Sequence, residues 1–115
     1  MGVIINFILF LVAIVIFLPL SVANIILVIF KGGNLSNYFK ETAVDIDRFG
    51  NRNLRTLLNA TLQKNGYKFG DERETISSVL GKNKRDGTLT KTGIIICNIL
   101  DRLDKNHCIK SIKEL

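Results

Sequence analysis

Charged residues are absent from the beginning of this chain. None of the 16 Lys and Arg or the 10 Asp and Glu lies between Met1 and Phe30, so the net charge of +6 belongs wholly to residues 31–115. Tryptophan is absent, and there are one proline, one histidine and two cysteines. So few cysteines exclude a dense disulfide framework, and no CxxC pair typical of zinc sites is present. The uncharged segment and the charged remainder therefore need separate interpretations.

The segment from Val3 to Phe30 predicts one transmembrane helix, since a bilayer core about 30 Å thick needs ~20 apolar helical residues. A cleaved signal peptide is disfavoured because no basic residue precedes the apolar run, which continues through Ile25 to Phe30. Pro19 predicts a kink, because proline removes a helical hydrogen bond. We prefer one kinked span to a re-entrant segment, because each half alone is too short to cross a bilayer.

The charges that flank the apolar segment predict its orientation. Lys31, Lys40 and Arg48 follow it, whereas only the α-amino group precedes it, so the remainder is expected in the cytoplasm. Cys97 and Cys108 are interpreted as reduced thiols, which agrees with a cytoplasmic location; a disulfide between them is the alternative. The basic remainder would attract anionic lipid headgroups and, as a weaker expectation, nucleic acid.

The remainder predicts an all-α domain of three to four helices, because no segment alternates with the two-residue period of a strand. We divide the chain into an anchor at 1–30, a joint and first helix at 31–50, and a small basic helical domain at 51–115. The first helix is expected from Leu35 to Ile46, with a break at 49–51.

Three further helices are expected in the domain. One spans about 51–64, with Leu54, Leu57, Leu58 and Leu62 as its buried face. Another lies within 71–82, with Asp71 and Glu74 as a capping box and Gly81 closing its end. The last spans about 90–105, capped by Thr88 or Thr90, with a buried stripe of Ile96, Ile99, Leu100 and Leu103.

Several polar residues are candidates for chemistry. Residues 82–87 are expected to form an exposed basic turn, in which Lys82, Lys84 and Arg85 could contact an anion or a lipid headgroup. A nucleotide-binding P-loop is excluded because the glycine-rich loop is missing. Too few ligands accompany His107 and Cys108 for a zinc site, so we predict neither a metal nor a cofactor.

Two short blocks, together, give a resemblance to a known group of proteins. They are Glu74-Thr75-Ile76-Ser77-Ser78-x-x-Gly81-Lys82 and Asn106-His107-Cys108-x-x-Ser111. On these blocks the chain resembles small, uncharacterised, membrane-anchored proteins of tailed bacteriophages, over roughly 51–112. Lys68-Phe69-Gly70-Asp71 departs from the Gly-Gly-Asp-Pro that is frequent there. The resemblance implies one shared site or one shared structural constraint, formed by Glu74, Thr75, Ser77, Ser78, Gly81, Lys82, His107, Cys108 and Ser111.

Three functional hypotheses follow. The preferred one is a phage-encoded, single-span protein of the host inner membrane that is not an enzyme and whose cytoplasmic domain binds a host or phage protein. The second is a lysis component, holin-like or regulating a holin, in which the membrane segment oligomerises with contacts shaped by Pro19 and Asn24. The third is a membrane-tethered enzyme that uses Glu74, Ser77, His107 and Cys108.

Overall fold

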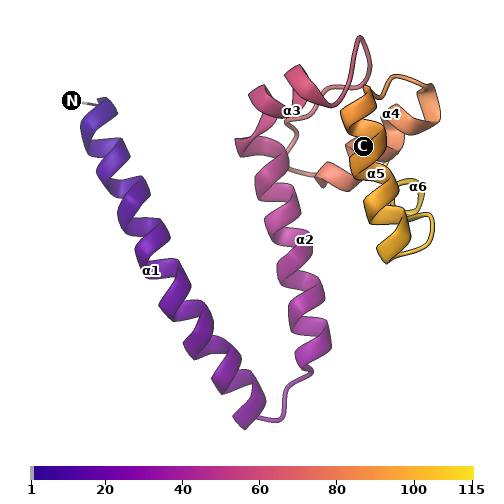
Figure 1. Cartoon of the computed structure of the whole chain (residues 1–115). Coiled ribbons are helices and arrows are strands. Elements are labelled where there is room, and N and C mark those ends of the chain that lie inside the picture. Colours follow the sequence, from indigo (N-terminus) through magenta and orange to yellow (C-terminus); the bar gives the residue numbers. More distant parts are fainter. Residues whose placement is uncertain (1) are drawn as a thin grey trace. The chain divides into compact units, whose positions relative to one another are not determined.

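The computed structural model describes residues 2–115, and the predicted all-α class is confirmed there (Figure 1). The pairing outside the helices in this part of the chain is one isolated antiparallel bridge, between Gln63 and Leu89. The chain divides into two compact units, of which the second is Glu41–Leu115. The helices are α1 (Gly2–Phe30), α2 (Leu35–Asn53), α3 (Arg55–Thr61), α4 (Ile76–Asp86), α5 (Lys91–Leu103) and α6 (His107–Lys110).

Helix α1 is long and apolar enough to cross a membrane, and it buries none of its side chains within the protein. It is a single helix that continues through Pro19, so the proline does not divide it into two separate segments. Two residues after the proline, the hydroxyl of Ser21 donates a hydrogen bond to the carbonyl oxygen of Phe17 at 2.8 Å. The predicted apolar helix is therefore confirmed as a structural element.

Helix α2 is longer than predicted, because it continues through the expected break at 49–51 to Asn53. The reason is tertiary: Asn51 is fully buried, and its side-chain amide donates to the carbonyl oxygens of Asp71 and Glu74 at 2.8 and 3.0 Å. Gly50 brings the helix against Ile76, whose Cδ1 would lie 3.0 Å from an added Cβ. The predicted helix at 51–64 is instead the end of α2, a turn at Leu54 and the short α3.

The core of the second unit is small and forms where α4 packs against α5 and α6 (Figure 1). Only parts of the predicted apolar stripes contribute to it, since four of their residues are exposed: Leu54 before α3, Leu57 on α3, and Ile99 and Leu103 on α5. The predicted buried faces were therefore wrong at these positions. The buried apolar cluster consists of Leu58, Leu62, Phe69, Val79, Leu80, Cys97 and Cys108.

The ends of α4 also differ from prediction. Its N-cap is Thr75, whose hydroxyl accepts a hydrogen bond from the Ser78 N–H, so the predicted Asp71–Glu74 capping box was wrong. The helix ends at Gly87, with φ +72°, and not at Gly81. Gly81 is needed inside the helix because a Cβ there would lie 2.0 Å from the carbonyl oxygen of Cys108. For α5, the predicted cap Thr90 is confirmed.

Candidate functional site

The residues of the two sequence blocks converge on α4, on α6 and on the residues that flank them. Helices α4 and α6 pack directly against each other, which explains why blocks separated in sequence meet in space. Thr75 caps α4, Gly81 allows the close approach of α6, and Ser111 ends α6 by donating its N–H to the carbonyl oxygen of His107. The predicted residues thus gather in one region, where most of them are buried.

A buried ion pair lies at the centre of this region. The Nζ of Lys82 is 2.8 Å from Oε2 of Glu74, and the two side chains are 3% and 0% exposed. Ser78 donates its hydroxyl to the same carboxylate oxygen at 2.7 Å, and its own oxygen accepts the N–H of Lys113. The ammonium group also lies 4.2 Å from the ring centroid of Tyr67. The ion pair therefore joins α4 to the loop before it, and Ser78 holds the C-terminal segment.

Opposing effects act on the pKa of Lys82. Burial lowers this pKa, but the hydrogen bonds and charges of Glu74 and Tyr67 outweigh burial, so the pKa of Lys82 lies above its usual value. The pKa of Tyr67 is raised as well, first by its hydrogen bond with Glu74 and then by burial. Lys82 therefore stays protonated, and its charge is neutralised inside the protein.

The predicted basic turn at 82–87 is wrong, because these residues belong to α4 and to its cap. Lys82 is buried and cannot contact an anion or a lipid headgroup at the surface, as had been expected. Lys84 pairs with Asp101 at 2.8 Å, and Arg85 pairs with Glu114 at 2.9 Å. The two exposed cations are thus already matched by carboxylates.

His107 lies within hydrogen-bond distance of both Asp104 and Ser77, as the histidine of a serine hydrolase triad does with its aspartate and serine. The Nδ1 of His107 lies 2.9 Å from Oδ2 of Asp104, and its Nε2 lies 3.1 Å from Oγ of Ser77. Lys110 and then His107 lower the pKa of Asp104, so this carboxyl remains ionised. Sequence analysis singled out Ser77 and His107 but missed Asp104, although its position three residues before His107 was a usable signal.

The surroundings of Ser77 differ from those of a nucleophile. Its side chain is buried, with 5% of the residue exposed, and its hydroxyl donates to Oδ2 of Asp47 at 3.0 Å. The other oxygen of Asp47 accepts the N–H of Ile76 at the start of α4. This arrangement joins α2, α4 and α6 through hydrogen bonds. It therefore acts as a structural connection, while substrate has little access to the hydroxyl.

The two cysteines form a disulfide, so the expectation of reduced thiols is wrong for this structure. Their Cα atoms are 6.1 Å apart, within the normal range for a disulfide, and the residues are 1% and 0% exposed. Because Cys108 is fully buried, substrate has no access to its sulfur, which weakens the enzymatic hypothesis. Asp101 lies beside the sulfur atoms, but sulfurs joined to each other do not act as thiolate ligands for a metal.

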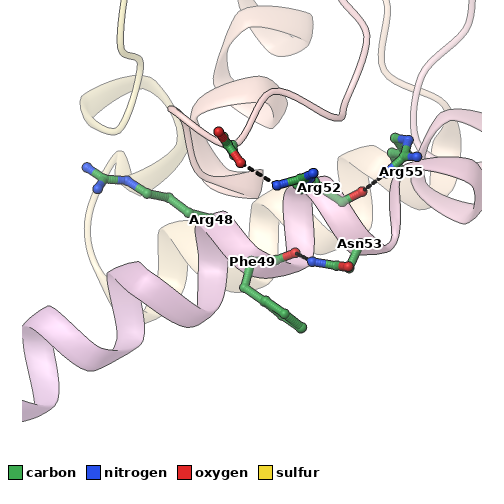
Figure 2. A pocket seen from close by; sticks show the side chains of 6 residues that line it. Arg48, Phe49, Arg52, Asn53 and Arg55 are labelled. Atoms are coloured by element: carbon green, nitrogen blue, oxygen red, sulfur yellow. Dashed lines mark hydrogen bonds and ion pairs between the residues drawn. The ribbon is translucent and has the colours of Figure 1, made fainter. Parts of the chain in front are cut away.

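A separate, open pocket of about 510 Å³ carries three arginines (Figure 2). Arg48, Arg52 and Arg55 lie along one side of the helix, and Phe49 and Asn53 lie along the other. Arg52 pairs with Glu72, and Arg55 donates to the carbonyl oxygen of Arg52 at 2.7 Å. The Nε of Arg48 is buried and has no hydrogen-bond partner in the part of the chain that the structure describes.

Sequence analysis did not identify this pocket. Arg48 and Arg52 have i, i+4 spacing, which places both side chains on one face of α2, and Arg55 follows at the first residue of α3. The signal was hidden because the helix was expected to end at 49–51, whereas α2 continues to Asn53.

A stripe of apolar side chains is exposed on α5. Ile95, Ile99 and Leu103, at i, i+4, i+8 spacing, are 59%, 54% and 81% exposed. Gly93 and Cys97 lie on the buried face of the same helix. We call the three exposed residues the α5 stripe. Helix α5 is therefore apolar on both sides, although only one side meets the core.

No protein-family model, no curated protein and no solved structure matches this chain. The resemblance to phage proteins stays a prediction, and the function is argued from the geometry.

Proposed function

We propose that this chain is a single-span membrane protein whose helical unit, 41–115, binds a protein partner. Helix α1 supports the anchor, because it is uncharged, apolar and long enough to cross a bilayer. Its apolar side chains are exposed, and water is an unfavourable environment for so large an apolar surface. A lipid bilayer would cover that surface without a further protein partner.

The α5 stripe is the observation that carries the binding role. Three large aliphatic side chains in line on one helix form a contiguous exposed surface, which in soluble domains marks a site of interaction. A partner helix or groove would contact these side chains as anchor residues at consecutive turns. Burying each of them would contribute about 1.5–3 kcal/mol before the cost of association.

Binding is preferred to catalysis because the chemically capable residues already have structural partners. Glu74 is paired with Lys82, Ser77 donates to Asp47, and Cys108 is fully buried in the core beside Cys97. These residues belong to the interior of the unit, whereas the α5 stripe faces solvent. The enzymatic hypothesis therefore has weaker support than the binding hypothesis.

The membrane is proposed to be the inner membrane of a phage host, on the resemblance carried by the two sequence blocks. Lys31, Lys40 and Arg48 support a cytoplasmic domain, whereas a Cys97–Cys108 disulfide favours an oxidising compartment. We propose the cytoplasmic side, because flanking charge acts during insertion, before the cysteines meet. The two cysteines would then be reduced thiols in the cell.

A cysteine introduced at the exposed position Lys68, in a chain with Cys97→Ala and Cys108→Ala, tests this orientation. An impermeant maleimide should label it only after the inner membrane is opened. Labelling after opening of the outer membrane alone would place the unit in the periplasm and make the disulfide its native state.

Site-specific photo-cross-linking tests the binding role. A photoreactive amino acid at Ile99 of the full chain should give a discrete cross-linked protein in infected or expressing cells, and the same amino acid at Lys68 should not. The cross-link should persist when α1 is replaced by an unrelated membrane helix. Equal cross-linking from both positions, or loss on replacement of the anchor, would contradict a specific role for the stripe.

A lysis role through α1 is the second candidate. It is supported by Asn24, an exposed polar side chain inside the apolar helix, because asparagine can hydrogen-bond between helices in a bilayer. Expression of α1 with its native unit should then depolarise the membrane, and Asn24→Leu should reduce the effect. An unchanged membrane potential on induction would refute this candidate.

A further inference from the structure

The pocket of Arg48, Arg52 and Arg55 is independent of the α5 stripe and of the two sequence blocks. The arginines belong to the C-terminal half of α2 and the first residue of α3, and the pocket is open to solvent. Three arginines line this pocket with one carboxylate, that of Glu72. Since Glu72 is already paired with Arg52, the pocket retains an excess of positive charge.

The donors of the pocket are only partly used. Arg48 has a buried Nε without a hydrogen-bond partner among the described residues, and such a donor is costly unless a ligand supplies an acceptor. Arg55 donates one of its five N–H groups to the carbonyl oxygen of Arg52. Guanidinium groups bind phosphate oxygens in pairs of parallel hydrogen bonds, so a phosphate group matches the charge and the type of donor present in the pocket.

Exposed apolar residues near the arginines indicate that the phosphate belongs to a membrane lipid. Ile46 and Phe49, on α2, are 56% and 65% exposed, and Leu54, which follows the helix, is 50% exposed. A basic face next to an exposed apolar face is typical of helices that lie in a membrane interface. Binding of a soluble phosphate compound would not explain why these apolar residues are exposed.

We propose that Ile46–Arg55 is a membrane-contacting segment whose arginines bind the phosphate of an anionic lipid headgroup. Phe49 and Ile46 would enter the boundary between headgroups and acyl chains. The inference rests on the proposed function in one respect, namely that α1 keeps the chain in a membrane. Residues 31–47, of which 35–47 are helical in α2, are all that separate α1 from the pocket in the sequence, so the pocket belongs to the part of the unit that follows the anchor directly.

Hydrogen–deuterium exchange of the full chain in lipid nanodiscs tests the proposal. Discs of phosphatidylcholine are compared with discs that also contain phosphatidylglycerol. Exchange at 46–57 should become about tenfold slower with the anionic lipid, which corresponds to about 1.4 kcal/mol of added protection from contact between the arginines and the lipid phosphates. Alkaline extraction from phosphatidylcholine discs is measured first, since it reports the anchor without the arginines.

Matched variants distinguish a specific phosphate site from non-specific attraction between a basic protein and an anionic membrane. The change Arg48→Gln, Arg52→Gln and Arg55→Gln should abolish the slowing. The control variant carries Lys64→Gln, Lys91→Gln and Arg102→Gln. It loses the same charge from exposed positions elsewhere and should still show the slowing of exchange. Unchanged exchange at 76–86 shows that the unit is folded. The single change Arg48→Gln removes an Nε that has no hydrogen-bond partner within residues 2–115, so it should retain the fold and lose most of the slowing.

Three results would overturn the proposal. Equal loss of the slowing in both triple variants would show that the lipid attracts the positive charge of the unit as a whole and not this pocket. Equal slowing by inorganic phosphate in phosphatidylcholine discs would assign the pocket to a soluble phosphate compound. Extraction of the unaltered chain by alkali would overturn both this inference and the anchor, whereas the first two results leave the anchor intact.

Discussion

Replacement of Lys82 by methionine should unfold much of unit 41–115, because it leaves the carboxylate of Glu74 buried without its cation. The two groups are 2.8 Å apart and at most 3% exposed. Methionine retains most of the volume of the lysine side chain, so the lost charge and not a cavity dominates the effect. The single hydroxyl of Ser78 would be the remaining partner that donates to the same carboxylate oxygen.

The magnitude follows from the cost of an unpaired buried charge. Removing one partner of a buried pair typically costs about 3–5 kcal/mol. A unit of this size rarely has more than roughly 3–5 kcal/mol of stability from its core. The folded fraction should therefore fall sharply. The double change Glu74→Gln and Lys82→Met removes both charges and should recover a large part of the loss.

The assay is hydrogen–deuterium exchange of α4 amides in the full chain in detergent micelles, which reports this unit separately from α1. The matched control is Lys84→Met on the same helix, because Lys84 is 41% exposed and its pair with Asp101 should contribute less than about 1 kcal/mol. Exchange in Lys82→Met no faster than in this control would refute the reasoning. No recovery in the double variant would show that packing, not charge, was lost.

Other changes test individual contacts with the same exchange measurement. Gly81→Ala should destabilise α4 and α6 together by about 1–3 kcal/mol, because the new Cβ would lie 2.0 Å from a backbone oxygen of Cys108; equal stability would show that α6 can move away. Thr75→Ala should cost about 1 kcal/mol through loss of the N-cap, Thr75→Ser should restore it, and no difference between them would exclude a capping role. Hydrogen bonds from Arg73 lower the pKa of Asp71 to about 2, so its contribution to stability is present above the usual pKa of about 4 and is lost as the pH falls towards 2. NMR titration should show this pKa rising in Arg73→Gln, and an unchanged value would contradict the assignment.

Local signals predicted part of this fold correctly. The apolar run gave α1, and a threonine before an apolar periodic segment gave the start of α5 at Thr90. Both features are decided by residues near in sequence, so no knowledge of packing was required. The same reasoning failed at Asn51, because the partners that make it helical, Asp71 and Glu74, lie twenty or more residues away.

Burial was the less predictable property. Ile99 and Leu103 have the spacing of a buried face, yet the core of this small unit uses only Gly93, Cys97 and their neighbours on α5. Lys82 has the charge of a surface residue, yet it is 2% exposed because Glu74 neutralises it. Periodicity identifies an apolar face but not what covers it, and charge does not identify an internal partner.

The placement of the two sequence blocks decides where function should be sought. Gly81 permits the contact between α4 and α6, Glu74 and Lys82 neutralise each other, and Thr75 caps the helix. Each of these roles serves the fold itself and needs no bound partner. The blocks therefore constrain the fold more than the function. The arginines of α2 and the α5 stripe lie outside the core, and changes there should alter membrane contact or partner choice while leaving the unit folded.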